Sequence, residues 1–183
     1  ACVSEAIGLA LMNSSGMPAP YESRDQYAEA SGRAVMDLLE KNIRARDVVT
    51  RQSLENAARI VACTGGSTNA GLHLPAIAHE AGIEFYLEDV CDIFRDTPYF
   101  VDLKPGGTYV AKDLYDAGGI PVVMKELRKA GLLHTDCLTH RDADHQDRRR
   151  GRTQGQPCPG RRYRQGRGHR RGTPALHRPR PRL

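Results

Sequence analysis

The chain has 183 residues, with 27 Lys/Arg against 22 Asp/Glu and a formal net charge of +5 at pH 7. Two unlike segments make up this total. Residues 1–139 carry 13 Lys/Arg and 19 Asp/Glu, whereas residues 140–183 carry 14 Arg, no Lys and 3 Asp/Glu. The positive total is therefore no evidence for a nucleic-acid-binding protein, because it adds an acidic segment to a basic one.

Composition argues against several other classes of protein. No run of about 18 apolar residues occurs, so we expect no membrane span, and no basic-then-apolar leader is visible, so we expect no secretory signal. The five cysteines include no C-x-x-C pair, which argues against a disulfide framework or a self-contained zinc site and favours a reduced, cytoplasmic setting. The chain begins at Ala1 inside a helical pattern, so we expect it to be an internal fragment of a larger protein.

The apolar spacing of the acidic segment predicts a domain made mostly of helices. In its first half, helices are expected over residues 1–11 and 24–41, separated by a Gly- and Pro-rich loop over residues 13–20. Residues 48–50 are expected to form a short connection, after which Ser53 can cap a third helix. One face of the second helix is predicted to carry Tyr27, Ala30, Ala34, Leu38 and Lys41.

The second half of this segment predicts two short strands among further helices. One helix is expected to end near Gly82, and residues 83–87 and 100–103 are expected to be strands because they are short apolar runs bounded by polar or turn residues. Helices over about residues 109–117 and 120–130 follow. The predicted fold class is therefore α/β, mostly helical.

The most specific local feature is the run Thr64, Gly65, Gly66, Ser67, Thr68 and Asn69. Its two glycines allow a close backbone approach to a ligand or a positive φ. The hydroxyls, with the free N–H groups at the start of the next helix, can cradle an anion or a carboxylate. The alternative is a tight turn in which Ser67 or Thr68 only caps the helix. Spacing alone leaves both interpretations open, and the run is neither a Walker loop nor a Rossmann fingerprint.

Three other candidates have ordinary explanations. His73 and His79 are six residues apart and do not share a helix face, so we expect no metal site from them and place His79 at a solvated helix end. Cys63 has no base beside it in sequence and is expected to be a buried core residue rather than a nucleophile. The following carboxylates are interpreted as a solvated acidic face rather than a metal cluster: Glu84, Glu88, Asp89 and Asp92.

Residues 140–183 differ from the rest in kind. They contain six Gly, five Pro and fourteen Arg, and Leu176 and Leu183 are their only large aliphatic residues. Such a segment buries too little apolar surface to offset the entropy lost on ordering, so a disordered tail is expected. The composition is that of an RNA-binding arm, but it lacks Lys and has Tyr163 as its only aromatic residue, so nucleic acid is not the expected partner.

Five stretches of residues 1–139 resemble the dihydroxy-acid dehydratases, the branched-chain amino-acid members of a family that also includes phosphogluconate and sugar-acid dehydratases. They are A-C-V-S-E-A-I-G-L-A-L, P-Y-E-S-R-D-Q-Y-A-E-A-S-G-R-A-V, T-G-G-S-T-N-A-G-L-H-L-P-A-I-A-H-E-A-G, D-L-K-P-G-G-T-Y-V and A-G-G-I-P-V-V-M-K-E-L. The A-H-E-A-G stretch favours dihydroxy-acid over phosphogluconate dehydratases. Met12 is a small departure, because the family more often has Pro there.

The resemblance implies part of the N-terminal catalytic domain of a cytoplasmic, homodimeric hydro-lyase. Such an enzyme removes water from 2,3-dihydroxy-3-methyl acids to give the 2-oxo acids that lead to valine and isoleucine, and it uses an iron–sulfur cluster ([2Fe–2S] or [4Fe–4S]) and Mg²⁺. The family's cluster cysteines, its C-D-K metal motif and the Ser base of its S-D-G-R motif have no match in this chain. No catalytic or metal-binding residue is therefore assigned, the chain alone is expected to be inactive, and the substrate-proximal candidates are residues 64–69.

The resemblance also offers an explanation for the tail. After D-C-L-T at residues 136–139 the family continues V-T-G-x-T-I, whereas this chain continues H-R-D-A-D-H-Q-D. Back-translated with GC-rich codons and read one base later, those eight residues begin T-G-T-R-T-I, so our hypothesis is a frameshift at about codon 140. Two alternatives stay open: a sugar-acid dehydratase of the same family, and a non-catalytic domain with an RNA-binding Arg-rich tail.

Overall fold

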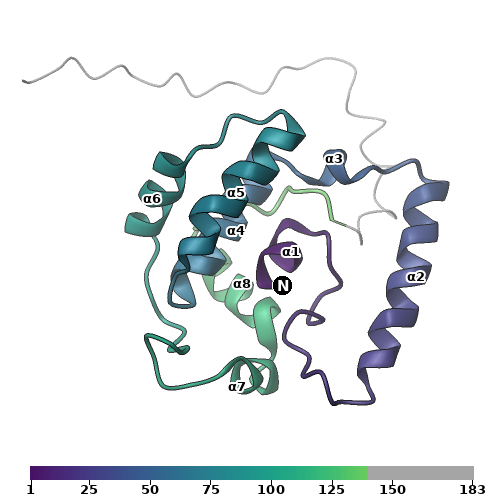
Figure 1. The fold of residues 1–183 in the computed structure, drawn as a ribbon, viewed down its shortest axis with the longest axis horizontal. Helices are drawn as coiled ribbons and strands as arrows, with labels where there is room; N and C mark the ends of the chain where they lie inside the picture. Colours follow the sequence, from purple (N-terminus) through teal and green to yellow (C-terminus); the bar gives the residue numbers. More distant parts are fainter. Residues whose placement is uncertain (140–183) are drawn as a thin grey trace, which may run out of the picture.

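The computed structural model describes residues 1–139, and residues 140–183 are not described (Figure 1). The predicted disorder of the tail lies outside the described residues. The described part contains eight helices: α1 (Cys2–Ile7), α2 (Arg24–Glu40), α3 (Ala45–Val48), α4 (Arg51–Cys63), α5 (Thr68–Ala81), α6 (Leu87–Asp96), α7 (Ala111–Asp116) and α8 (Gly119–Lys129). Within these residues no helix is long and apolar enough to cross a membrane.

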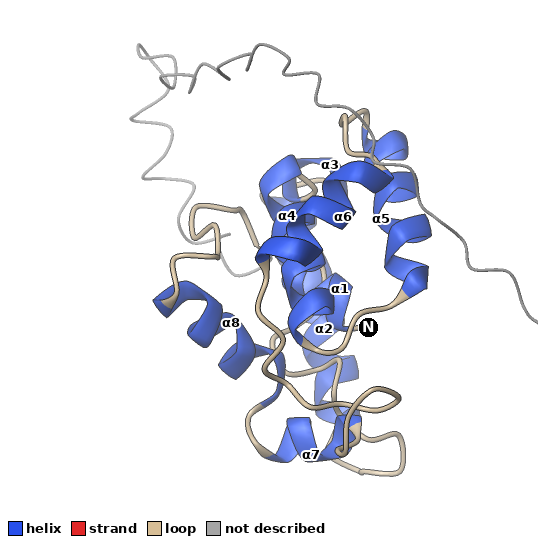
Figure 2. Ribbon diagram, turned by 90° about the vertical axis from the view of Figure 1, so that its left-hand side faces the viewer, coloured by secondary structure: helices blue, strands red, loops and turns tan. Residues whose placement is uncertain are grey.

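The prediction of a mostly helical fold is confirmed, but the α/β class is not. Figure 2 shows helices and loops without a strand over residues 1–139, where the nearest approach to a sheet is one isolated bridge between Leu103 and Tyr109. Both predicted strands are wrong, because their backbone groups pair with helix ends. The Ile83 N–H closes the end of α5 on the Ala78 carbonyl at 2.8 Å, and the Val101 N–H donates to the Cys63 carbonyl at 3.0 Å.

Helix α4 is the centre of the fold, and it packs against α1, α5, α6 and α8 (Figure 1). Apolar and small residues recur along it at intervals of three and four, which places them on one buried face. The residues of α4 with 0% exposure are Ser53, Leu54, Ala57, Ala58, Ile60 and Cys63. Burying each large aliphatic side chain contributes about 1.5–3 kcal/mol. The Thr64–Asn69 turn therefore leaves from the best-buried helix of the described chain.

The start of α4 differs from expectation in one detail. The N-cap is Thr50 rather than Ser53, and the Thr50 hydroxyl accepts a hydrogen bond from the Ser53 N–H at 3.2 Å. The Ser53 hydroxyl accepts one in return from the Thr50 N–H at 2.8 Å. Ser53 is thus the third residue of the helix, and it completes a reciprocal cap that satisfies two backbone donors.

Helix α1 is shorter than predicted. It ends at Ile7 because Gly8 adopts a left-handed φ of 101°, after which the Leu9 N–H turns back to the Ser4 carbonyl at 2.9 Å. Leu11, inside the range predicted for this helix, instead lies in the following loop. A single glycine therefore overrides an apolar spacing that continues beyond it.

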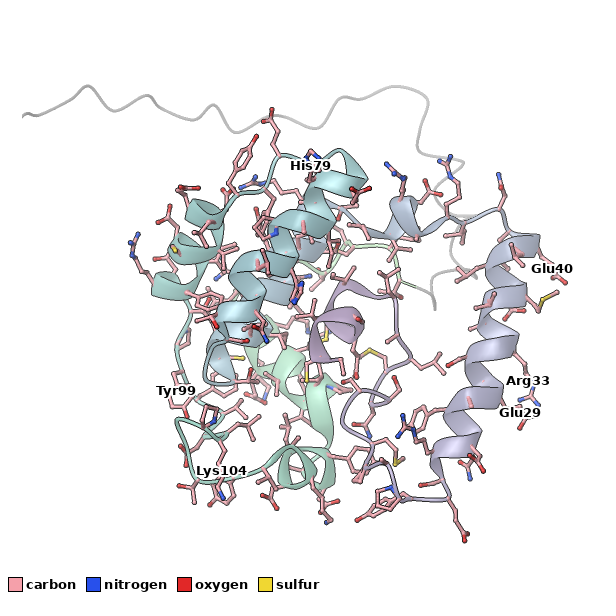
Figure 3. The ribbon with its side chains drawn as sticks, in the orientation of Figure 1. Glu29, Arg33, Glu40, His79, Tyr99 and Lys104 are labelled. Atoms are coloured by element: carbon pink, nitrogen blue, oxygen red, sulfur yellow. The ribbon has the colours of Figure 1, made fainter. Side chains whose placement is uncertain are left out.

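Helix α2 is confirmed within one residue of its predicted end, but its environment is unusual. Figure 1 shows it at the edge of the molecule, and none of its residues is buried. The predicted inward face is half-buried at each of its positions: Tyr27, Ala30, Ala34, Leu38 and, just after the helix, Lys41. Figure 3 shows Glu29 and Arg33, which form an ion pair, together with Glu40 on the outer side of this helix.

Helices α3 and α6 were not predicted. Helix α6 follows directly on the segment that the sequence indicated as a strand, and its inward residues are Val90, Ile93 and Phe94. The Asp89 carboxylate accepts the Tyr86 N–H at 2.8 Å and pairs with Arg51 of α4 at 2.6 Å. A local cap and one ion pair to the central helix thus hold α6 in place.

Candidate functional site

The glycines of the Thr64–Asn69 turn form the end of α4. The Gly65 N–H donates to the Ala62 carbonyl at 3.3 Å, and the Gly66 N–H donates to the Val61 carbonyl at 2.8 Å. This pair of bonds is the Schellman arrangement, which requires a residue in the left-handed region just after the helix. Gly65 and Gly66 have φ angles of 112° and 76°. Both positions therefore need glycine for a reason that lies in the turn itself.

Thr64 belongs to the helix rather than to a ligand site. Its hydroxyl donates towards the Ile60 carbonyl at 2.7 Å and lies 3.1 Å from the Val61 carbonyl. The oxygen sits half-buried against the last turn of α4. Of the four candidates with polar side chains, Thr64 is thus the one whose side chain is already hydrogen-bonded within the described chain.

The three residues after the glycines are open to solvent. Ser67, Thr68 and Asn69 are exposed, and their side chains make no hydrogen bond to any residue of the described chain. Ser67 occupies the N-cap position of α5 with an extended backbone, but its hydroxyl forms no capping bond. The N–H groups of the first turn of a helix have no partner within that helix. The turn therefore presents uncommitted hydroxyl, amide and backbone donors at the positive end of a 14-residue helix.

The loop between α6 and α7 lies over this turn. A Cβ placed on Gly65 would lie 3.5 Å from the Leu103 carbonyl oxygen and 3.7 Å from Tyr99 Cε2. Tyr99 in turn donates its hydroxyl to Asp102 Oδ1 at 3.2 Å. Figure 3 shows Tyr99 and Lys104 in this loop. The turn thus has a neighbour from more than 30 residues further along the chain.

Asp102 organises that loop and is ionised. Its carboxylate accepts the Thr108 N–H at 3.1 Å, and its backbone carbonyl accepts the Tyr109 N–H at 2.9 Å. Hydrogen bonds from Thr108, and then from Tyr99, hold the pKa of Asp102 below its ordinary value of 3.8. The sequence alone did not identify Tyr99 as a neighbour of the turn or Asp102 as the partner of its hydroxyl. The available signal was the turn-forming run that begins D-L-K-P-G-G at Asp102.

The ordinary explanation of Cys63 is confirmed. Its side chain has 0% exposure, and its thiol lies 3.3 Å from the Ile60 carbonyl. Burial raises the pKa of the thiol to about 12, so it stays protonated at neutral pH. A thiol in this state is a core residue rather than a nucleophile.

The histidines and carboxylates lie apart from one another. His73 and His79 are exposed, and Figure 3 shows His79 near the end of α5. The acidic face is confirmed at its exposed members: Glu84, Glu88 and Asp92. Asp89 differs, because it is partly buried. Burial alone would raise its pKa, but the hydrogen bond from the Tyr86 N–H and the ion pair with Arg51 lower it by more, so the pKa lies below its ordinary value of 3.8. Within residues 1–139 no group of three or more His, Cys, Asp or Glu side chains could hold a metal ion.

Comparison with known proteins settles which family contains this turn. The family model described as "Dihydroxy-acid/6-phosphogluconate dehydratase N-terminal" matches residues 1–148. The chain belongs to this dehydratase family. Dihydroxy-acid dehydratases from Dinoroseobacter shibae, Parvibaculum lavamentivorans and Pelagibacter ubique are 86%, 72% and 67% identical to it over 139 residues. The resemblance noted from the sequence is thereby confirmed.

These matches also show how much of such a protein is present. The aligned residues make up 76% of this chain and 24% of each of these three relatives, so the chain spans about a quarter of their length. The described residues do not fit an iron–sulfur cluster or Mg²⁺, since they contain no suitable group of ligands and the buried Cys63 is a protonated thiol.

Proposed function

We propose that this chain is part of a dihydroxy-acid dehydratase, a hydro-lyase that converts 2,3-dihydroxy-3-methyl acids to 2-oxo acids in valine and isoleucine biosynthesis. The observation that carries the proposal is the 86% identity to the Dinoroseobacter shibae dihydroxy-acid dehydratase over 139 residues. The stretch His79, Glu80, Ala81 and Gly82 supports this member of the family over the phosphogluconate dehydratases.

We further propose that residues 64–69 border the substrate and that Ser67, Thr68 and Asn69 bind its carboxylate. The substrate is an anion, and anions are stabilised at the N-terminus of a helix such as α5. Gly65 and Gly66 bring no side chains of their own to the turn, and the three residues after them are exposed. Thr64 supports the turn and does not contact the substrate, because its hydroxyl is bonded to α4.

The remaining chemistry is proposed to come from the rest of the enzyme. The ligands of an iron–sulfur cluster and of Mg²⁺ would come from residues outside those described. The base that takes the C2 proton would come from there as well. The isolated chain is accordingly proposed to be inactive. By resemblance, the whole enzyme is proposed to be a cytoplasmic homodimer.

The test is a full-length chimera in which residues 1–139 replace the matching residues of the Dinoroseobacter shibae relative. The expected result is formation of the 2-oxo acid from a 2,3-dihydroxy-3-methyl acid, measured by derivatisation of the keto group. A folded chimera that is inactive on this substrate, or that accepts only 6-phosphogluconate or another sugar acid, would overturn the proposal.

The role of the turn has its own test in the same chimera. Ser67→Ala is expected to raise KM for the dihydroxy acid roughly 10-fold or more, because hydrogen bonds to charged groups contribute about 1.5–3 kcal/mol. The matched control is Ser31→Ala, which removes an exposed serine hydroxyl from α2. Equal KM values for the two variants would refute substrate contact at the turn.

For residues 140–183 we propose a tail translated in a shifted frame. The support is the alignment to the relatives, which covers the N-terminal 76% of the chain. The family model extends further, to residue 148. Resequencing of the DNA tests this, and an intact frame would refute it. The alternative of an RNA-binding tail predicts salt-dependent RNA binding that disappears when residues 140–183 are deleted.

A further inference from the structure

An apolar groove of about 440 Å³ lies between α7, α8 and the loop that joins α6 to α7. Figure 1 shows these three segments together along the lower part of the molecule. Val123, which is 2% exposed, lies at its floor. Phe100, Tyr109 and Val122 form its walls with exposures of 45%, 56% and 42%. Two aromatic rings and a valine at these exposures form a patch of the kind that marks an interface.

The aromatic walls are held in place by the backbone. The N–H of Phe100 donates to the Cys63 carbonyl at 3.3 Å. Tyr109 is held on both sides, since its N–H donates to the Asp102 carbonyl at 2.9 Å and its carbonyl accepts the Lys104 N–H at 2.8 Å. These bonds anchor the backbone of the loop at Phe100 and Tyr109, so the positions from which the two rings project are set before anything binds.

The carboxylates of the groove already have partners within the described chain. Asp102 accepts from Thr108 and Tyr99, the Asp113 carboxylate caps α7 through the Val110 N–H at 2.8 Å, and Glu126 pairs with Lys129 at 2.7 Å. A small-molecule site needs a few polar groups that orient the ligand. This groove offers apolar walls and a carboxylate rim instead, which fits apolar side chains flanked by Lys or Arg on another segment of polypeptide.

We propose that the groove is the docking surface for an apolar segment of the remaining polypeptide of a full-length family member. About three-quarters of each relative lies outside its match to this chain, so a large part of the protein is available to cover this surface. The Leu103 carbonyl faces Gly65 while its side chain lines the groove, so the docked segment lies against the loop that covers the substrate-proximal turn. The proposal needs family membership only, and not the proposed reaction.

Hydroxyl-radical footprinting with mass spectrometry tests this without altering the groove. The oxidation rates of Phe100 and Tyr109 are compared between the 183-residue chain and the full-length chimera. In the chimera both rates are expected to fall about tenfold or more, since an interface core excludes water as a protein interior does. Unchanged rates in a folded chimera would overturn the proposal. Protection that is already present in the 183-residue chain and fades on dilution would also overturn it, because the occupant would then be a second copy.

A variant confirms the site of docking. Val122→Lys places a charge on an exposed wall residue and is expected to restore Tyr109 oxidation in the chimera at least partly. The matched control Val35→Lys makes the same change on α2, where Val35 is 54% exposed, and is expected to leave Tyr109 protected. Equal protection in both variants would place the covering segment elsewhere. Circular dichroism of each variant separates loss of docking from loss of the fold.

Discussion

Asn56 holds the C-terminal end of the described chain against α4, and its replacement tests how this fold is held together. The side chain is 2% exposed. Its Nδ2 donates to the His134 carbonyl at 2.9 Å, and its Oδ1 accepts the His134 N–H at 2.9 Å. One side chain thus satisfies both backbone groups of a residue that lies in neither a helix nor a strand. Asn56→Ala removes both bonds at once.

The magnitude follows from these two bonds. Each contributes about 0.5–1.5 kcal/mol net, and a buried partner left unsatisfied costs about 1–3 kcal/mol. His134 is half-buried, so water replaces part of what is lost. Asn56→Ala is therefore expected to lower the free energy of unfolding by about 2–3 kcal/mol.

Asn56→Asp has the same size and gives a sharper result. Near neutral pH its carboxylate faces the His134 carbonyl as a second acceptor, and the cost is expected to exceed that of the alanine. In mild acid the protonated carboxyl donates where Nδ2 did, and most of the stability returns. The sign follows from burial, which raises the pKa of the new carboxyl in the folded state, so the penalty appears as pH rises above the unfolded pKa.

Urea unfolding followed by far-UV circular dichroism measures these effects. Wild type and variants are compared at each pH, which cancels the titration of other groups. Asn69→Ala, at an exposed position, is the matched control. An unfolding free energy of Asn56→Ala within about 0.5 kcal/mol of wild type, as for surface substitutions, would refute this prediction. Equal destabilisation of Asn56→Asp at neutral and acid pH would refute it as well.

Three further predictions concern backbone, charge and thiol chemistry. Gly65→Ala places a Cβ at a φ of 112° and is expected to lower the free energy of unfolding by about 1–2 kcal/mol. Gly32→Ala, inside a helix with no atom within 4 Å of the new Cβ, is expected to raise it by about 0.5–1 kcal/mol. Urea unfolding measures both, and equal effects would contradict this prediction. The pKa of Asp89 is lowered in the folded state, so its stabilisation is present above the unfolded pKa and is lost as pH falls through the folded pKa. Asp89→Asn is therefore expected to lower the free energy of unfolding by about 1 kcal/mol near neutral pH and to have no effect in strong acid. A difference in unfolding free energy that does not depend on pH would refute this. Iodoacetamide is expected to modify exposed Cys91 and to leave buried Cys63 unmodified in the folded chain, as mapped by peptide mass, and equal labelling rates would refute the burial of the thiol.

Several features that depend on neighbouring residues were predicted correctly, although the end of α1 at Gly8 was missed. The loop over residues 13–20, helix α2 and the end of α5 at Gly82 follow from proline, glycine and apolar spacing, which act over three or four residues. The Thr64–Asn69 turn was likewise identified from its residues, because two adjacent glycines before a possible cap have few other uses. The structure adds that Thr64 is committed to α4 and that Ser67 makes no capping bond.

Features that depend on distant partners were missed. Residues 83–87 and 100–103 were expected to be strands, yet an extended segment becomes a strand only if another pairs with it. Helix α6 was hidden because the carboxylates within and just before it suggested a solvated segment, although Val90, Ile93 and Phe94 have helical spacing. The contact between the turn and Tyr99 was beyond any local pattern.

By itself, the sequence determined the family, the acidic and basic segments, several helix ends and the residues of the turn, because glycine conformation, capping and apolar periodicity act within a few residues. Only the tertiary structure decided that α4 is the central helix, that the expected strands satisfy their backbone at helix ends, and that Tyr99 and Leu103 lie over the turn. The physical reason is that burial and hydrogen-bond pairing between distant segments are settled by competition among all of them at once, and this competition also leaves the groove beside α8 open.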